Sequence, residues 1–175
     1  MKKAGVFLPL AGIVLAMGCM KMYLVVQEPA TPLKTFGKVK MMEGDAKEFL
    51  ANVKARDDED RKKYESLAKD GVAIMKNTTQ EWLDAKWKGD DPKRTLACRP
   101  VLKSYDPGSA AARFLVGAGR GRVVFDVFCY DGKKTVAQVT IDQEIAGAMF
   151  GADKYFAFKQ AAYRLGRYFQ DEMRK

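Results

Sequence analysis

The sequence contains no histidine and only three serines. The lack of histidine removes the commonest general base and the commonest transition-metal ligand. None of the serines lies in a Gly-x-Ser-x-Gly pattern, and no cysteine has a histidine partner, so catalysis of the Ser-His or Cys-His kind is excluded. Cys-x-x-Cys, EF-hand and P-loop patterns are also missing. We therefore expect a protein that is not an enzyme and that needs no metal ion or cofactor.

The amino-terminal segment has the features of a secretory signal. Lys2 and Lys3 precede an apolar run over residues 4–18 that ends at Cys19, which is the order of a charged region, an apolar region and a small residue before a cleavage point. The cysteine makes the segment resemble a lipoprotein signal. Residues 1–18 would then be removed, and Cys19 would carry a diacylglyceryl thioether and become the first residue.

Two alternatives to this reading remain open, a plain secretory signal and an uncleaved membrane anchor. The anchor would run from Ala4 to Met20, which is 17 residues and the bottom of the spanning range of ~17–25. Pro9 lies inside it. The protein would then be a single-pass anchored subunit of a membrane complex.

The compartment also decides how the basic charge is interpreted. Without Lys2 and Lys3, the chain has 29 basic and 22 acidic residues, a balance of +7. A secretory signal directs the protein away from the genome, so we expect no nucleic-acid partner. The excess charge suits anionic lipid headgroups, acidic polymers or envelope proteins beside the membrane, or it serves solubility alone.

The chain beyond the signal is long enough for one domain. Residues 19–33 contain Pro29 and Pro32 and are expected to form a tether after the lipidated cysteine. Residues 34–175 are then expected to fold as a single α+β domain with its own core.

A hairpin is the clearest structural pattern. Apolar residues alternate over 121–130 and again over 133–142, with the period of half-buried strands. A three-residue loop would place Phe125 opposite Ala137, so that both apolar sets share one face. Gly132 would supply the left-handed residue of a bulge, which predicts a positive φ there.

Helices and a further strand are predicted around this hairpin. Apolar residues at spacings of three and four predict amphipathic helices over 58–88 and 153–173. Trp82 is expected in the core of the first. A strand is predicted over 95–104, where Pro100 indicates an edge position or a bulge. The expected fold is a two-layer α+β sandwich, an antiparallel sheet of three to four strands covered on one face by two helices.

Two runs in the second half resemble a family of bacterial envelope lipoproteins that carry a domain of unknown function. They are YDPGSAAARFLVGAGRGRVVFDVFCYDG and GAMFGADKYFAFKQAAYRLGRYFQDEM. The shared pattern is a turn, an R-F-L-V-G segment, a G-x-G-x-G loop, a hairpin and a closing amphipathic helix. This chain has VGAGRG where the family more often has V-G-F-G-A-G. The resemblance implies a further strand near 35–42 and a lipidated (palmitate-bearing) protein. Because Met20 is not the aspartate that retains lipoproteins at the inner membrane, it also implies the periplasmic face of the outer membrane. It carries no activity.

The candidate site residues are few. Cys98 and Cys129 are predicted to face inward on neighbouring strands, where they either form a disulfide or remain two free buried thiols. Arg113, Arg120 and Arg122 flank the glycine loop and could gather a small anionic ligand. We expect a lipid-anchored envelope protein that acts by binding or assembly at the membrane surface, with an anionic-ligand module as the alternative.

Overall fold

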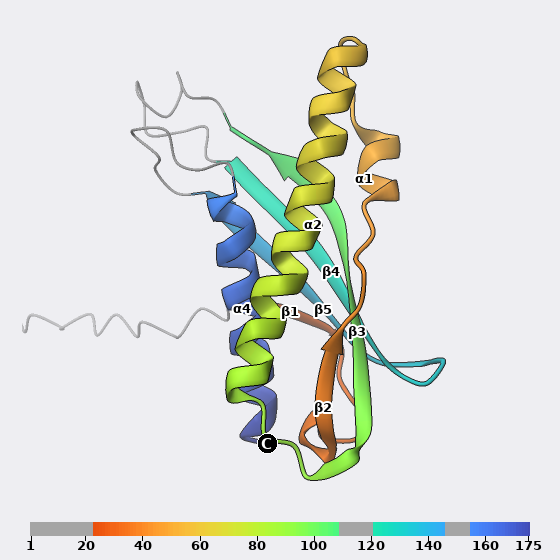
Figure 1. The fold of residues 1–175 in the computed structure, drawn as a ribbon, viewed down its shortest axis with the longest axis vertical. Coiled ribbons are helices and arrows are strands. Elements are labelled where there is room, and N and C mark those ends of the chain that lie inside the picture. The colour runs from red at the N-terminus through yellow and green to blue at the C-terminus, as the bar shows by residue number, and fades with distance from the viewer. Residues whose placement is uncertain (1–22, 109–120, 146–154) are drawn as a thin grey trace, which may run out of the picture.

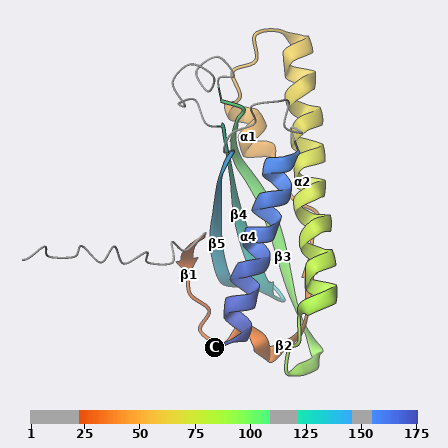
Figure 2. The same cartoon turned by 90° about the vertical axis from the view of Figure 1, so that its left-hand side faces the viewer.

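Two long helices cover one face of a five-stranded sheet (Figures 1 and 2). The computed structural model describes residues 23–108, 121–145 and 155–175. The sheet has the order β1-β5-β4-β3-β2, and its pairs are antiparallel except β2 with β3, which is parallel. The elements in chain order are β1 Leu24–Gln27, a 3-10 turn Leu33–Thr35, β2 Phe36–Met41, α1 Lys47–Asn52, α2 Asp58–Lys86, β3 Asp91–Asp106, β4 Gly121–Asp131, β5 Lys134–Ile145 and α4 Phe156–Met173.

The mixed α+β character and the two covering helices agree with the prediction, but the sheet is larger than three to four strands and is not wholly antiparallel. The strand implied near 35–42 is β2. Because α1 and α2 lie between β2 and β3, the chain crosses back over the sheet and β3 runs in the same direction as β2. The fifth strand, β1, comes from the segment expected to be a tether, and it pairs with β5 around Val139.

Pro100 lies inside β3, the strand between β4 and β2. The pairing of β2 with β3 reaches no further than Met41 opposite Cys98. Beyond that point, the Pro100 carbonyl accepts a hydrogen bond from the Asp45 amide at 2.9 Å. Pro100 has no backbone N–H to donate, and the side of β3 on which that N–H would lie is no longer paired with β2 here. Pro100 therefore lies at what is locally an edge of the sheet, where proline is tolerated.

The hairpin has the predicted faces but a different register. Gly132 has a φ of +60°, as predicted, yet it begins a two-residue turn because Asp131 pairs with Lys134. Phe125 is opposite Ile141, not Ala137. The register shifts after Cys129, where β5 has one extra residue. This bulge brings the apolar residues of both strands to one face, an effect that we had expected from a three-residue loop.

The core lies between the helices and the sheet, and Phe158 of α4 is at its centre. Its ring is fully buried, stacks on Tyr105 with a centroid distance of 5.5 Å and meets Phe125 edge-on at 6.0 Å. A Cβ added at Gly71 of α2 would lie 2.4 Å from this ring, so the glycine lets the two helices approach. Trp82, expected in the core, is half-buried. The residues that α2 buries are Leu67, Ala68, Gly71, Val72, Met75, Thr79 and Leu83.

Three predicted features lie outside the described residues: the lipidation of Cys19, the R-F-L-V-G segment and the glycine loop from residue 117. Within residues 23–108, 121–145 and 155–175, no helix has the length and apolar composition needed to cross a bilayer.

Candidate functional site

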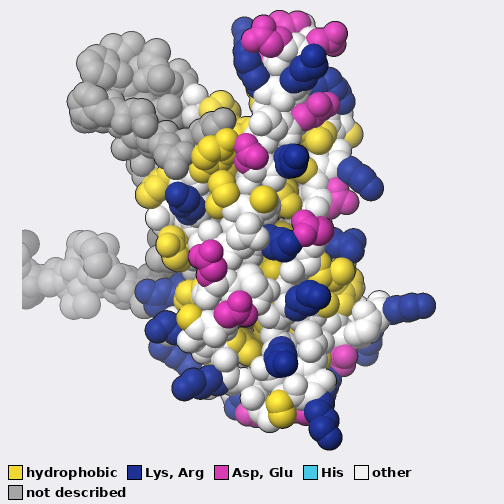
Figure 3. Space-filling view, in the orientation of Figure 1, with side chains coloured by type: hydrophobic (Ala, Val, Ile, Leu, Met, Phe, Trp, Pro, Cys, Tyr) yellow, Lys and Arg dark blue, Asp and Glu magenta, His cyan; other side chains and the backbone are white. Residues whose placement is uncertain are grey.

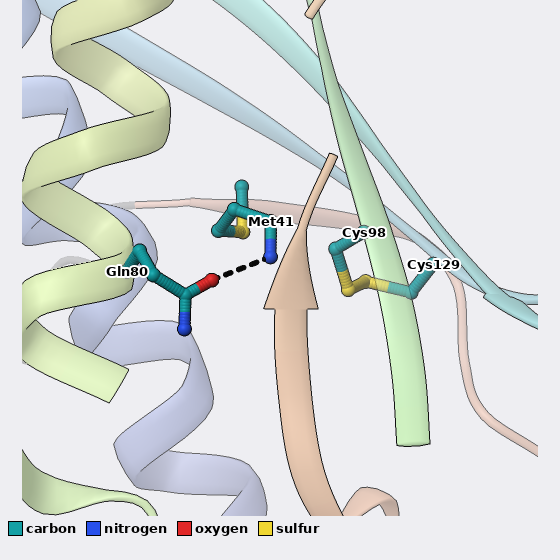
Figure 4. Close-up of a disulfide and its surroundings, with 4 residues drawn as sticks. All are labelled: Met41, Gln80, Cys98 and Cys129. Carbon is teal, nitrogen blue, oxygen red and sulfur yellow. Dashed lines mark hydrogen bonds between the residues drawn. A yellow bond between two sulfur atoms is a disulfide. The ribbon is translucent and has the colours of Figure 1, made fainter. Parts of the chain in front are cut away.

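The outer edge of β2 is closed by a side chain instead of another strand. Gln80 of α2 accepts a hydrogen bond from the Met41 amide at 2.7 Å through Oε1 (Figure 4). Its Nε2 donates to the Val39 carbonyl at 3.3 Å. The same Nε2 lies 2.7 Å from an Asp84 carboxylate oxygen, which holds the amide in orientation. Gln80 thus presents to β2 the donor and acceptor that a neighbouring strand would present.

The start of the same edge is held by Trp87, the residue that follows α2. Its indole Nε1 donates to the Phe36 carbonyl at 2.9 Å, and its ring packs edge-on against Phe169 of α4 at 5.8 Å. A buried indole needs such a partner for its N–H. Gln80 and Trp87 therefore hydrogen-bond the end of α2, and the residue after it, to the backbone of β2 at two points.

Two adjoining hollows follow this edge and share the side chains of Lys40, Gln80 and Asp84. One of about 410 Å³ lies between β2 and the end of α2, and one of about 720 Å³ continues past the end of β2. We call them together the β2 groove. Its remaining lining residues are Gly37, Lys38, Val39, Met41, Met42, Glu43, Lys76, Leu83, Trp87, Thr95 and Arg99.

The charges of the β2 groove are unbalanced. Lys76 forms an ion pair with Glu43 across it. Among the described residues, no carboxylate lies within ion-pair distance of Lys38, Lys40 or Arg99. Figure 3 shows the same bias, because dark blue side chains outnumber magenta ones over the lower half, around β2 and the end of α2. The groove is suited to an acidic ligand.

The groups that line the β2 groove are suited to binding. In the part of the chain that the structure describes, no cluster of three His, Cys, Asp or Glu side chains could hold a metal ion. The lining offers amide, ammonium, guanidinium and carboxylate groups, together with the backbone of a strand. These groups recognise extended or anionic partners.

The three arginines predicted to gather an anion are only partly described. Arg122 lies on the face of the sheet away from the helices, where its Nε donates to Asp142 Oδ1 at 2.7 Å and its Nη2 donates to the other oxygen. This hydrogen-bonded pair raises the pKa of Arg122 and lowers the pKa of Asp142. The charge of Arg122 is thus already matched by Asp142. Arg113 and Arg120 lie outside the described residues.

Cys98 and Cys129 are directly opposite each other on β3 and β4, with Cα atoms 4.1 Å apart. The structure joins their sulfur atoms at 2.03 Å, and both side chains are fully buried (Figure 4). Of the two alternatives, a disulfide or two free thiols, the structure has the disulfide. It links the centre of the sheet one strand away from the β2 groove.

The β2 groove was not anticipated from the sequence. Gln80 is a single polar residue on the side of a long helix, a position that normally indicates contact with solvent. Its partners on β2 are backbone atoms, which leave no trace in the residue pattern. Trp87 packs edge-on against Phe169, but its hydrogen bond to Phe36 depends on where β2 pairs.

No family model matches this chain, and no curated protein matches it in sequence. One structure with a similar course of the chain is a dodecamer of a point variant of PelC from Paraburkholderia phytofirmans. The two sequences are 12% identical, the match covers 87% of this chain and 97% of the other, and the TM-score is 0.45. PelC in another crystal form gives 12% identity over 82% and 96%, with a TM-score of 0.45. A candidate lipoprotein from Caulobacter crescentus CB15 gives 12% identity over 76% and 88%, with a TM-score of 0.43. Likeness at this level carries no argument about function.

Proposed function

We propose that this chain is a lipid-anchored protein of the bacterial cell envelope that acts by binding a protein partner, without catalysis. The anchor is supported by the leader that ends at Cys19. The buried pair Cys98 and Cys129, bonded in the structure, suits an oxidising compartment. With Met20 after the cysteine, we place the anchor in the periplasmic face of the outer membrane.

The observation that carries the binding role is the β2 groove. It combines a strand edge that one side chain closes with three cations, Lys38, Lys40 and Arg99, that have no carboxylate partner among the described residues. An extended segment with acidic side chains fits both features. Its backbone can lie along the groove without pairing with β2, whose outward groups Gln80 and Trp87 already bind, and its carboxylates can reach Lys40 and Arg99. We infer that such a segment of another envelope protein occupies the groove.

Reversing the charge of the groove is expected to release the partner. In the double variant Lys40→Glu, Arg99→Glu, two attractive contacts become repulsive, and like charges brought together at an interface cost several kcal/mol. Tagged full-length protein is purified from detergent-solubilised membranes at low salt, and the proteins that accompany it are quantified. We expect at least one accompanying protein to be retained by the wild type and to be lost from the double variant.

The double variant Lys62→Glu, Lys69→Glu is the matched control, because it also reverses two positive charges. Lys62 and Lys69 are exposed lysines on α2, and neither lines a hollow of the groove. This variant should retain every protein that the wild type retains. If the Lys40→Glu, Arg99→Glu variant and the wild type retain the same proteins in the same amounts, the groove is not the binding site.

A further inference from the structure

The folded domain begins very close to the residue that would carry the lipid. Tyr23, the first described residue, lies four positions after Cys19. At no more than about 3.6 Å per residue, four residues reach roughly 14 Å. If the chain is held instead by an uncleaved span that ends at Met20, the reach is shorter still. Either anchor leaves no room for a long tether between the bilayer and the domain.

The place where the chain enters the domain is fixed. The Tyr23 hydroxyl donates to Asp171 near the end of α4 at 2.5 Å, and its ring meets buried Tyr168 edge-on at 5.2 Å. The next residues form β1, which pairs with β5 at the edge of the sheet opposite to β2. Figure 2 shows β1 beside the lower half of α4. The anchor therefore holds the β1 edge of the sheet toward the membrane.

The surface at this edge has apolar side chains that the fold leaves uncovered. Leu24 is 65% exposed and Val26 is 53% exposed, and both belong to β1. Tyr163 of α4 is 53% exposed and lines a hollow of about 310 Å³ beside β5, together with Arg164 and Arg167. Among the described residues, neither arginine has a carboxylate within ion-pair distance.

We propose that the β1 edge of the sheet lies on the bilayer, with Leu24 and Val26 of β1 and Tyr163 and Arg167 of α4 at the contact. The inference rests on the membrane anchor of the proposed function and adds an orientation to it. Leu24 is opposite Thr140 and points away from the helices, so it meets the bilayer from the other side of the sheet than the α4 residues do. Aliphatic side chains would enter the boundary between headgroups and acyl chains, tyrosine suits the headgroup layer, and the exposed Arg167 reaches lipid phosphates, whereas Arg164 donates to the Asp142 carbonyl. The β2 groove lies four strand spacings away, about 19 Å, so it faces away from the bilayer edge and stays open to a partner.

Tryptophan reporters test this orientation in the full-length protein reconstituted into phosphatidylethanolamine and phosphatidylglycerol vesicles with brominated acyl chains. Leu24→Trp and Val26→Trp place an indole on β1, where an exposed side chain is replaced without disturbing the core. Ala73→Trp is the control, since Ala73 is exposed on α2, the helix that packs on β2 and β3. The signal of the native tryptophans is subtracted with the parent protein. Flotation of the vesicles reports the anchor separately.

We expect the parent protein and all three variants to float with the vesicles. The added emission of the two β1 reporters should shift to the blue and be quenched by the brominated chains. The added emission of Ala73→Trp should show neither change. If the proteins float but both β1 reporters are unquenched, the orientation is wrong and the anchored function stands. If the Ala73→Trp reporter is quenched as strongly as those on β1, no particular face lies on the bilayer and the orientation is again wrong. If the proteins do not float, the anchor fails and the orientation fails with it.

Discussion

Replacing Cys98 and Cys129 together by alanine is expected to lower the free energy of unfolding by about 3 to 4 kcal/mol. The two residues are 31 positions apart in the chain. In the chain-entropy model, closing a loop of that length removes enough freedom from the unfolded chain to stabilise the fold by this amount. Urea denaturation followed by tryptophan fluorescence measures the loss as a lower midpoint.

Reduction provides the control for this prediction, because it breaks the bond and leaves both side chains in place. Wild-type protein in excess reductant should unfold at nearly the same urea concentration as the double variant, and reductant should not affect the variant. Alkylation after denaturation should find more reactive thiols with reductant than without it. An equal number in both samples, with an unchanged midpoint, would show that the two cysteines are free in the native protein.

Phe158→Ala is expected to cost about 3 to 5 kcal/mol of unfolding free energy, the usual range when a buried phenylalanine is truncated. Phe158 is fully buried, and three parts of the fold close around it: α2 at Gly71, β3 at Tyr105 and β4 at Phe125. Since α4 contributes this ring, the loss should loosen the contact between the two helices. Urea denaturation again measures the change.

Phe156→Ala is the matched control, on the same helix and with the same change of side chain. Phe156 is 46% exposed, so its truncation removes much less buried surface and should cost no more than about 1 kcal/mol. If the two variants lose stability equally, the assignment of Phe158 to the centre of the core is wrong.

The parts of the fold that the sequence predicts are those with a strong residue pattern. Leu96 and Leu102 in β3 and the alternating residues of β4 and β5 are buried as the period of two requires. The parts that it misses are held by backbone pairing. The strand β1 has four residues and is fixed by its register with β5, while its sequence continues the apolar leader. The direction of β2 depends on how the crossover through α2 is routed.

The candidate site was harder to predict than the fold for a related reason. The arginine pattern around the glycine loop suggested an anion site, but Arg122 is paired across the sheet with Asp142, and sequence spacing does not show such a pairing. The β2 groove arises because Gln80 of α2 and Trp87, which follows α2, reach the backbone of β2. Contacts between a side chain and the main chain leave no signature in composition or periodicity.

We propose above all that the protein is held at the membrane by its amino terminus and works there by contact. Intact mass spectrometry of the mature amino-terminal peptide, from protein isolated with the membrane fraction, tests it most directly. We predict a chain that begins at Cys19 with a diacylglyceryl thioether and an acylated amino group. Protein recovered from the cytosol, with its initiator methionine and an unmodified thiol at position 19, would contradict the claim.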